Sequence, residues 1–248
     1  DTPDTTARLG HGDAMHVTDI DPHNPGLEIF TSHEGGTSAP YGYAMRDAET
    51  GEVLFGGYTG VDTTRAMVGD IDPELPGLEV WSNSAEDATA DPVGLWTARG
   101  ERIDAPNPGA NQSVRWAADL TTQQMHGALT EEYVTPTIED WRRGTLLTAE
   151  GTTTNNWWKG NPSLVADVWG DWREEVLLPT TDSSAIRIYT STEVTDHKLY
   201  TLMHDPQYRV EVARQQTTYN QPSHPGFYLA ADMDWSDVPL PVGAGGRR

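Results

Sequence analysis

The sequence has no cysteine, and this absence excludes disulfide bonds, thiolate metal ligands and thiol nucleophiles. It fits an extracellular bacterial protein held together by metal ions and its core, and equally a cytosolic one. No run of about 18 apolar residues occurs, so no membrane-spanning helix is expected. Residue 1 does not open a signal peptide, and the chain reads as a mature or trimmed product.

Basic residues are also scarce. Sixteen Lys and Arg residues stand against 38 Asp and Glu residues, which gives a net charge of −22. This balance excludes a basic face for nucleic acid or for an anionic membrane. The acid excess has two explanations, a solvating surface and metal ligation, and we expect both to contribute.

Helix-forming residues are few, whereas 24 Gly, 17 Pro and nine Trp residues are present. This composition favours short strands joined by turns, so the predicted fold class is all-β. Nine Trp and nine Tyr residues, together with regular apolar runs, argue against disorder.

Two stretches, 17–30 and 68–81, match at most positions and lie 51 residues apart. Each has two aspartates two positions apart, then a turn rich in Pro and Gly, then a glutamate before an apolar strand. Calcium takes about 6–8 oxygen ligands and is bound by loops of this kind. The predicted metal ligands are Asp19, Asp21 and Glu28 in the first stretch and Asp70, Asp72 and Glu79 in the second.

A shorter signature, two small or apolar residues before an aspartate and an aliphatic residue, occurs five times. Its aspartates, spaced 51, 49, 48 and 65 residues apart, are Asp19, Asp70, Asp119, Asp167 and Asp232. A period near 50 is typical of a propeller blade, which is a four-stranded antiparallel sheet. We therefore predict about four to five blades in a single domain over residues 1–248. The fourth signature adds a weaker metal site at Asp167, Asp171 and Glu175, with Trp169 at the place of the second aspartate.

Apolar strands are expected at 27–32, 78–82 and 175–178, and hairpins at 42–54 and 95–103 that turn at Gly51 and Gly100. By contrast, the segment 123–144 is expected to be partly helical or loop-like, and 107–111 to be a turn.

Two polar segments are candidates for sugar binding. Residues 152–162 combine Thr, Asn and Trp with Lys159, one of only two lysines against fourteen arginines. An amine in this setting suggests a titratable base, while Trp and Asn suit sugar rings and hydroxyls. The alternative is a solvated loop lysine beside core tryptophans. Similarly, the segment 219–229 is either a ligand-binding run or a turn at the top of a blade.

These segments together resemble the rhamnogalacturonan lyases that carry a calcium-rich eight-bladed β-propeller. The resemblance is carried by residues 10–16 with the aspartate stretch that follows, and by 154–159, 170–176 and 219–229. It implies β-elimination in the galacturonate–rhamnose backbone of pectin. It also implies that the family's catalytic region is longer than this chain, which would hold the C-terminal half of the propeller.

The resemblance assigns roles to particular residues. His11 matches a cleft histidine that helps to hold calcium, and Arg65 matches a cleft arginine. Lys159 and Tyr219 match an active-site lysine and tyrosine. The matching sugar-binding loop contains Asn155, Asn156 and Trp157. From the residues alone, His11 is either a calcium-side ligand or base, or a lone surface histidine.

The expected partner is rhamnogalacturonan I, with several calcium ions as cofactors, in a secreted, monomeric bacterial protein. Two other readings stay open. One is a non-catalytic calcium-stabilised propeller that binds carbohydrate, and the other is a folded but inactive remnant. Residues 1–10 contain no alternating apolar strand that would close a small ring, so an open arc of blades is expected.

Overall fold

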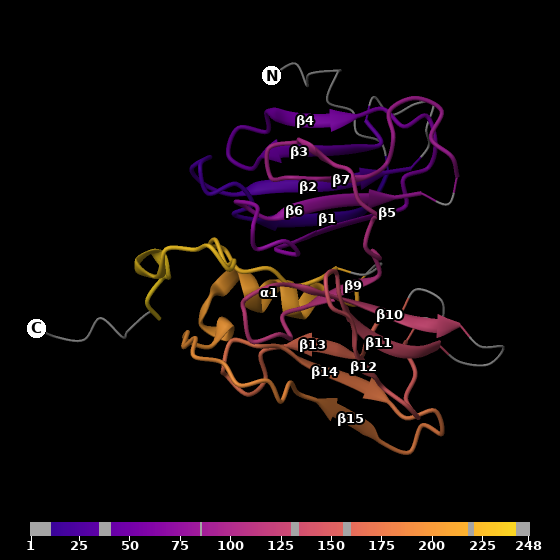
Figure 1. Ribbon diagram of the computed structural model, residues 1–248, viewed down its shortest axis with the longest axis vertical. Helices are drawn as coiled ribbons and strands as arrows, with labels where there is room; N and C mark the ends of the chain where they lie inside the picture. The colour runs from indigo at the N-terminus through magenta and orange to yellow at the C-terminus, as the bar shows by residue number, and fades with distance from the viewer. Residues whose placement is uncertain are drawn as a thin grey trace, which may run out of the picture. The chain divides into compact units, whose positions relative to one another are not determined.

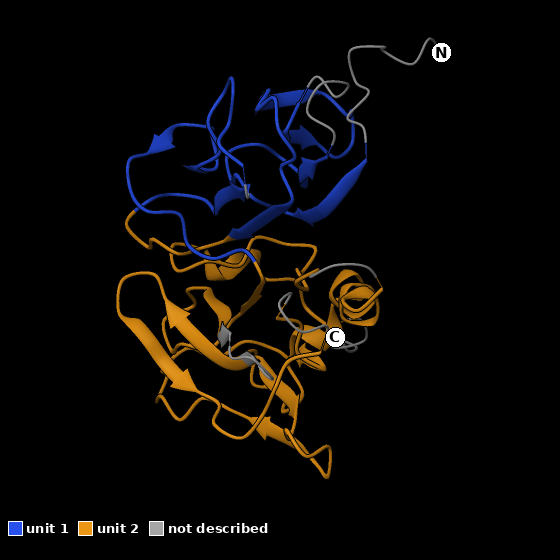
Figure 2. Ribbon diagram, turned by 90° about the vertical axis from the view of Figure 1, so that its right-hand side faces the viewer, with its two compact units in different colours: residues 1–68, 75–110 blue, residues 69–74, 111–248 orange. Residues whose placement is uncertain are grey.

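The computed structural model describes residues 11–34, 41–84, 86–129, 134–155, 160–217 and 221–241 (Figure 1). It divides into two compact units (Figure 2). Unit 1 comprises residues 1–68 and 75–110, and unit 2 comprises residues 69–74 and 111–248.

The first sheet of unit 1 is a four-stranded meander in sequence order, with antiparallel neighbours. Its strands are β1 (Gly12–Thr18), β2 (Glu28–His33), β3 (Tyr43–Asp47) and β4 (Val53–Gly57). The predicted hairpin at 42–54 is confirmed, because β3 and β4 are joined through Gly51. The φ of Gly51 is +75°, a conformation that glycine adopts without a steric penalty.

The second sheet also has its strands in sequence order, but the last two strands are only two residues long each. Its strands are β5 (Arg65–Gly69), β6 (Glu79–Asn83), β7 (Leu95–Trp96) and β8 (Arg102–Ile103). The turn between β7 and β8 lies at Gly100 with φ +81°, as the sequence predicts.

Apolar side chains from both sheets form the core of unit 1. Phe30 and Met45 from the first sheet and Val80 and Trp81 from the second are inaccessible to solvent. Tyr43 stacks on Trp96 with ring centroids 4.2 Å apart, so aromatic packing joins the two sheets.

Unit 2 begins with a third four-stranded meander, of spatial order β12-β11-β10-β9. Its strands are β9 (Gln112–Val114), β10 (Gln123–Leu129), β11 (Val134–Asp140) and β12 (Gly144–Thr148). The helical or loop-like reading of 123–144 is therefore wrong. Gln123 is buried on β10, where its side-chain oxygen accepts hydrogen bonds from the amides of Trp116 and Ala117 at 2.9 and 2.8 Å. Partners of this kind allow a polar sequence to form a buried strand.

The fourth sheet has three strands, namely β13 (Leu164–Ala166), β14 (Glu175–Pro179) and β15 (Ile186–Tyr189). It shares a core with the third sheet that includes Met125, Ile138 and Val176. The predicted strand at 175–178 is β14.

The rest of unit 2 has little regular structure. It contains the short helices η3 (Leu202–His204) and η4 (Trp235–Asp237) and the helix α1 (Pro206–Arg214). The Asp205 side chain caps α1 by accepting from the amide of Tyr208 at 2.8 Å, and Pro206 occupies the first turn. Leu202 and Tyr208 pack with Trp172 and Leu229 in a separate core.

The fold is thus all-β with few helices, as predicted, and each four-stranded sheet has its strands in sequence order. Among the residues that the structure describes, no helix is long and apolar enough to cross a membrane.

Candidate functional site: an acidic cluster and the aspartate loops

An imidazole and two carboxylates meet at the open end of the β1–β2 hairpin. His11 Nδ1 lies 3.2 Å from Glu34 Oε2 and 3.7 Å from Asp13 Oδ1. The strand register causes this meeting. Gly12 is paired with His33, and the amide of Glu34 donates to the carbonyl of His11 at 2.7 Å, so residues 11 and 34 are neighbours.

The electrostatics of this cluster favour a cation. Burial, and then the charge of Glu34, raises the pKa of Asp13 to about 6. The same two causes, in the same order, raise the pKa of Asp62. Burial lowers the pKa of Arg65, and the negative charge of Asp13 opposes this effect. Several acids thus share a partly desolvated space, which disfavours their ionised forms unless positive charge enters.

Across the described ranges, this is the one group in which three His, Asp or Glu ligand atoms lie within 4.8 Å of one another. Two carboxylates supply hard oxygen ligands of the kind that calcium takes, and the exposed His11 adds a nitrogen. The structure therefore brings two predicted residues, His11 and Arg65, to one acidic cluster. Sequence reasoning missed Glu34 and Asp62, although pairing the two strands of the hairpin would have placed residue 34 beside residue 11.

In the first aspartate loop the three predicted carboxylates approach one another, but they have different roles. Glu28 Oε2 accepts from the amides of Ile20 and Asp21 at 2.7 and 3.1 Å, so this buried glutamate holds the loop closed. Asp19 Oδ1 is buried and accepts no hydrogen bond from the described residues. Burial, and then the charges of Glu28 and Asp21, raises the pKa of Asp19 to about 6. Asp19 is thus the carboxylate of this loop with an oxygen left for a cation.

The second loop is divided between the units, because Asp70 and Asp72 belong to unit 2 and Glu79 to unit 1. Asp70 is 1 % exposed, and its Oδ2 accepts from the amide of Ala231 at 2.6 Å. Its Oδ1 has no hydrogen-bond partner among the described residues.

Burial raises the pKa of Asp70 to about 7, and the charges of Asp232, Asp119 and Asp72 act in the same direction. Aspartates of the third and fifth signatures therefore face Asp70 within unit 2, a convergence that sequence reasoning did not anticipate. A buried, unsatisfied carboxylate oxygen facing other carboxylates fits a bound cation.

The fourth loop is different, because its carboxylates are engaged by protein donors. Asp167 accepts from the amides of Gly170 and Leu202 at 2.6 and 2.7 Å and from a threonine hydroxyl. Glu175 Oε2 accepts from two loop amides, repeating the part that Glu28 plays in the first loop. Asp171 pairs with Arg173 at 2.7 Å. This loop is stabilised by its own hydrogen bonds and leaves little capacity for metal binding.

Residues 156–159 of the predicted sugar-binding segment, which include Asn156, Trp157 and Lys159, lie outside the described residues, as does Tyr219. Asn155 is described and half-buried. Its amide donates to the carbonyl of Asn161 at 2.6 Å, and its side chain donates to the carbonyl of Pro162 at 3.3 Å. Asn155 therefore closes the base of this loop.

Comparison with known proteins identifies the family. A family model described as the C-terminal domain of rhamnogalacturonan lyase family 11 matches residues 2–239. The chain belongs to this family. The resemblance predicted from residues 10–16, 154–159, 170–176 and 219–229 is thereby confirmed.

Two similar proteins come from Bacillus subtilis (strain 168). The chain is 45 % identical over 245 residues to the rhamnogalacturonan exolyase YesX, covering 96 % of this chain and 40 % of the relative. It is 45 % identical over 229 residues to the rhamnogalacturonan endolyase YesW, covering 91 % of this chain and 34 % of the relative. The chain thus spans well under half the length of these relatives.

Solved structures give the same match. The crystal structure of exotype YesX aligns with a TM-score of 0.84 at 46 % identity, over 91 % of this chain and 38 % of that one. A rhamnogalacturonan lyase of Bacillus licheniformis aligns with a TM-score of 0.81 at 43 % identity, over 93 % of this chain and 38 % of that one.

Proposed function

We propose that the protein is a rhamnogalacturonan lyase that cleaves the rhamnogalacturonan I backbone of pectin by calcium-assisted β-elimination at galacturonate. The observation that carries the proposal is the acidic cluster of His11, Asp13 and Glu34, with Arg65 beside it, in a chain of family 11. An acidic protein binds an acidic polymer only where bound cations or Arg and Lys side chains reverse the local charge.

In this proposal each residue has a separate role in the reaction. Calcium, when bound, supplies positive charge next to the galacturonate carboxylate and stabilises the charge that develops there. Arg65 orients that carboxylate. The Lys159 amine removes the proton at C5, the C–H electron pair forms the C4–C5 double bond, and the C4–oxygen bond breaks. Tyr219 gives a proton to the departing oxygen.

We assign the calcium ligands from the carboxylate oxygens that accept no hydrogen bond from the described residues or that lie close to other ligand atoms. His11, Asp13 and Glu34 form one site, and Asp19 and Asp70 each direct a buried carboxylate oxygen to a further one. The four sheets are blades of an eight-bladed propeller that continues in other parts of the protein, consistent with the meander order of each sheet. The protein is secreted by a bacterium and acts as a monomer.

The test is the ultraviolet absorbance of the unsaturated product when the intact protein meets rhamnogalacturonan. Lys159→Ala is expected to lower the rate by at least about a hundredfold, the usual contribution of a general base, while the melting temperature stays unchanged. Arg102→Ala, which removes an exposed cation to which no role in binding or catalysis is assigned, is the control and keeps the wild-type rate. Retention of most turnover by Lys159→Ala would reassign the base.

A second candidate is a non-catalytic, calcium-stabilised module that binds carbohydrate. The observation that favours it is that the buried oxygens of Asp19 and Asp70 fit cations that would stabilise the fold without touching a substrate. This candidate predicts that rhamnogalacturonan is bound by the intact protein and recovered uncleaved.

A further inference from the structure

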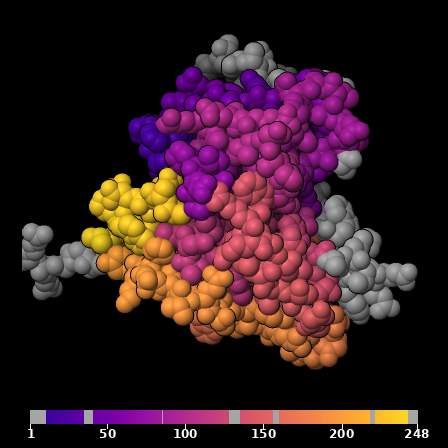
Figure 3. Space-filling view, viewed as in Figure 1, coloured from indigo at the N-terminus to yellow at the C-terminus, as the bar shows by residue number. Residues whose placement is uncertain are grey.

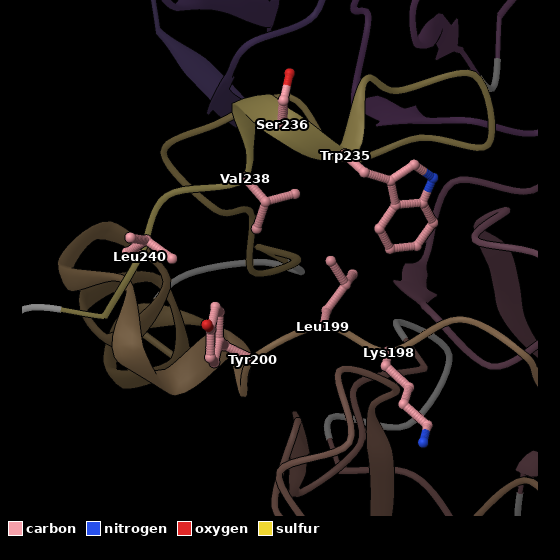
Figure 4. A pocket seen from close by; sticks show the side chains of 7 residues that line it. All are labelled: Lys198, Leu199, Tyr200, Trp235, Ser236, Val238 and Leu240. Atoms are coloured by element: carbon pink, nitrogen blue, oxygen red, sulfur yellow. The ribbon is translucent and has the colours of Figure 1, made fainter. Parts of the chain in front are cut away.

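A pocket of unit 2 is lined by residues that have no part in the roles above. Its volume is about 350 Å³, within the range of about 300–1,000 Å³ typical of small-ligand sites. Two segments distant in sequence form it at the surface, where they are coloured orange and yellow (Figure 3). The lining residues are Lys198, Leu199, Tyr200, Trp235, Ser236, Val238 and Leu240 (Figure 4).

Specific contacts hold both walls of the pocket. Asp234 caps η4, because its Oδ1 accepts from the amide and the hydroxyl of Ser236 at 2.8 and 2.7 Å. The two ring nitrogens of His204 lie 2.6 Å from the carbonyl oxygen of Thr201 and 3.0 Å from that of Pro239. His204 therefore ties the wall that ends at Tyr200 to the wall that contains Val238 and Leu240.

The pocket combines exposed aromatic rings with an apolar floor. Trp235 is 43 % exposed and Tyr200 is 47 % exposed, whereas Leu199 and Val238 are half-buried. His197 stacks on the Trp235 ring with centroids 5.2 Å apart, which fixes the orientation of the indole. Fixed rings of this kind pack against the apolar face of a sugar.

Charge narrows the choice of ligand. Among the described residues that line the pocket, Lys198 is the one with a charged side chain, in a chain of net charge −22 with only two lysines. Asp234, the acidic residue next to Trp235, accepts a hydrogen bond from the Ser236 hydroxyl at 2.7 Å. The Lys198 amine lies at the rim and points away from the centre in Figure 4, on a flexible stem that can turn toward a bound anion.

We propose that this pocket is an accessory site for a uronic-acid unit of an acidic polysaccharide, with Trp235 and Tyr200 against the sugar ring and Lys198 on its carboxylate. The choice of polymer rests on the proposed function, while the choice of a uronate rests on the pocket itself. Such a site would keep the polymer attached between cleavage events by adding a second point of contact.

The experiment is fluorine NMR of the intact protein labelled with fluorotryptophan, at saturating calcium. The resonance of Trp235 is assigned by its disappearance in Trp235→Phe, and that of Trp169 by Trp169→Phe. The probes are a galacturonate–rhamnose disaccharide and its carboxyl-reduced, neutral counterpart. Trp169 is 60 % exposed in unit 2 and outside the pocket, so it is the matched control for non-specific stacking.

We expect the Trp235 resonance to shift with the acidic disaccharide, with Trp169 unmoved. Lys198→Met is expected to raise the Kd for the acidic probe about fivefold, the effect of losing one rim ion pair, and to leave that for the neutral probe unchanged. Lys198→Arg should restore the wild-type Kd. The proposal is overturned if Trp235 stays unmoved, if Trp169 shifts in parallel, or if both probes bind equally.

Three further outcomes separate this proposal from others. Broadening of the Trp235 resonance with protein concentration alone would show that a second copy of the chain covers the pocket, and would also overturn it. A Trp235 shift in a protein that does not cleave rhamnogalacturonan would support the pocket and count against the lyase function. Cleavage of rhamnogalacturonan without a Trp235 shift would support the lyase function and overturn the proposed pocket.

Discussion

At the scale of single residues, buried carboxylates are the feature that most needs a physical explanation. Asp70 is 1 % exposed and has one oxygen without a hydrogen-bond partner among the described residues. A group whose pKa is raised on folding stabilises the fold fully below its unfolded pKa and loses this contribution as pH rises through the folded value. For Asp70 the window runs from 3.8 to about 7. Above it, a bound cation is needed to offset the buried charge.

Asp70→Asn should therefore raise the melting temperature in excess chelator at pH 8 and leave it unchanged at pH 4. The upper limit of the gain is about 4 kcal/mol, from a pKa shift of roughly three units. The side-chain oxygen that accepts from Ala231 is kept in this variant. With calcium present, the variant should gain less stability from the ion than the wild type. Calorimetry at the two pH values measures both effects, and a lower melting temperature for the variant at pH 8 in chelator would contradict the account.

Unit 2 also buries an ion pair that the sequence did not reveal. Glu174 Oε2 accepts from the Arg115 amide at 2.8 Å, and its Oε1 accepts from the Tyr208 hydroxyl at 2.7 Å and lies 3.8 Å from the Arg115 guanidinium. Burial raises the pKa of Glu174, and the charge of Arg115 opposes this. Arg115 directly follows β9, Glu174 directly precedes β14, and Tyr208 lies in α1, so these contacts connect the three elements.

Arg115→Met should destabilise the protein by about 3–5 kcal/mol, because it leaves the Glu174 charge buried without its partner. Arg209→Met removes an exposed arginine of the same unit and should cost no more than about 1 kcal/mol. Chemical denaturation measures both, and Arg115→Met with Glu174→Gln should recover part of the loss. Equal, small effects of the two single substitutions would show that the pair contributes nothing.

At the scale of elements, two hairpin turns form a matched pair. Gly51 and Gly100 have φ values of +75° and +81°. A Cβ at Gly51 would have no heavy atom within 4 Å, whereas a Cβ at Gly100 would lie 2.7 Å from Cγ of Phe55.

Gly51→Ala should cost roughly 1 kcal/mol, the strain of a left-handed alanine. Gly100→Ala should cost about 1–3 kcal/mol more, because the Phe55 ring must also move. The difference between their unfolding free energies is the quantity to measure, and equal costs would contradict the close approach of Gly100 to the Phe55 ring.

Local sequence patterns predicted the strands and turns that have local causes. Alternating apolar residues and Gly at 51 and 100 were enough for β3, β4, β7 and β8. The strand β10 was missed because its polar Gln123 finds hydrogen-bond partners only once the sheet has formed. The helix α1 was missed although the Asp205–Pro206 pair is a start signal, since its apolar periodicity is weak.

In the candidate site too, the sequence predicted the features with local causes and missed those that depend on tertiary contacts. The aspartate loops could be recognised in the sequence because they repeat. The sequence did not show which carboxylates would accept hydrogen bonds from loop amides, as Glu28 and Glu175 do. Glu34 joins His11 through strand register, and Asp232 faces Asp70 through contacts 161 residues or more apart. Such contacts follow from tertiary structure and have no local signal.

At the scale of the whole molecule, acidity and the proposed substrate oppose each other. A net charge of −22 repels the galacturonate units of rhamnogalacturonan unless cations are held where the polymer binds. In the proposed function, a cation held by His11, Asp13 and Glu34 would reverse this repulsion at the candidate site, and Lys198 would do so at the proposed accessory pocket.

The most direct measurement is mass spectrometry of the products that the intact protein releases from rhamnogalacturonan I in water enriched in heavy oxygen. Elimination breaks the C4–oxygen bond without adding water, so each new non-reducing end should carry a double bond and no new product should contain heavy oxygen from cleavage. Products that incorporate it at the point of cleavage would show hydrolysis, and recovery of the intact polymer would show binding without catalysis. Either result would contradict the proposed lyase function.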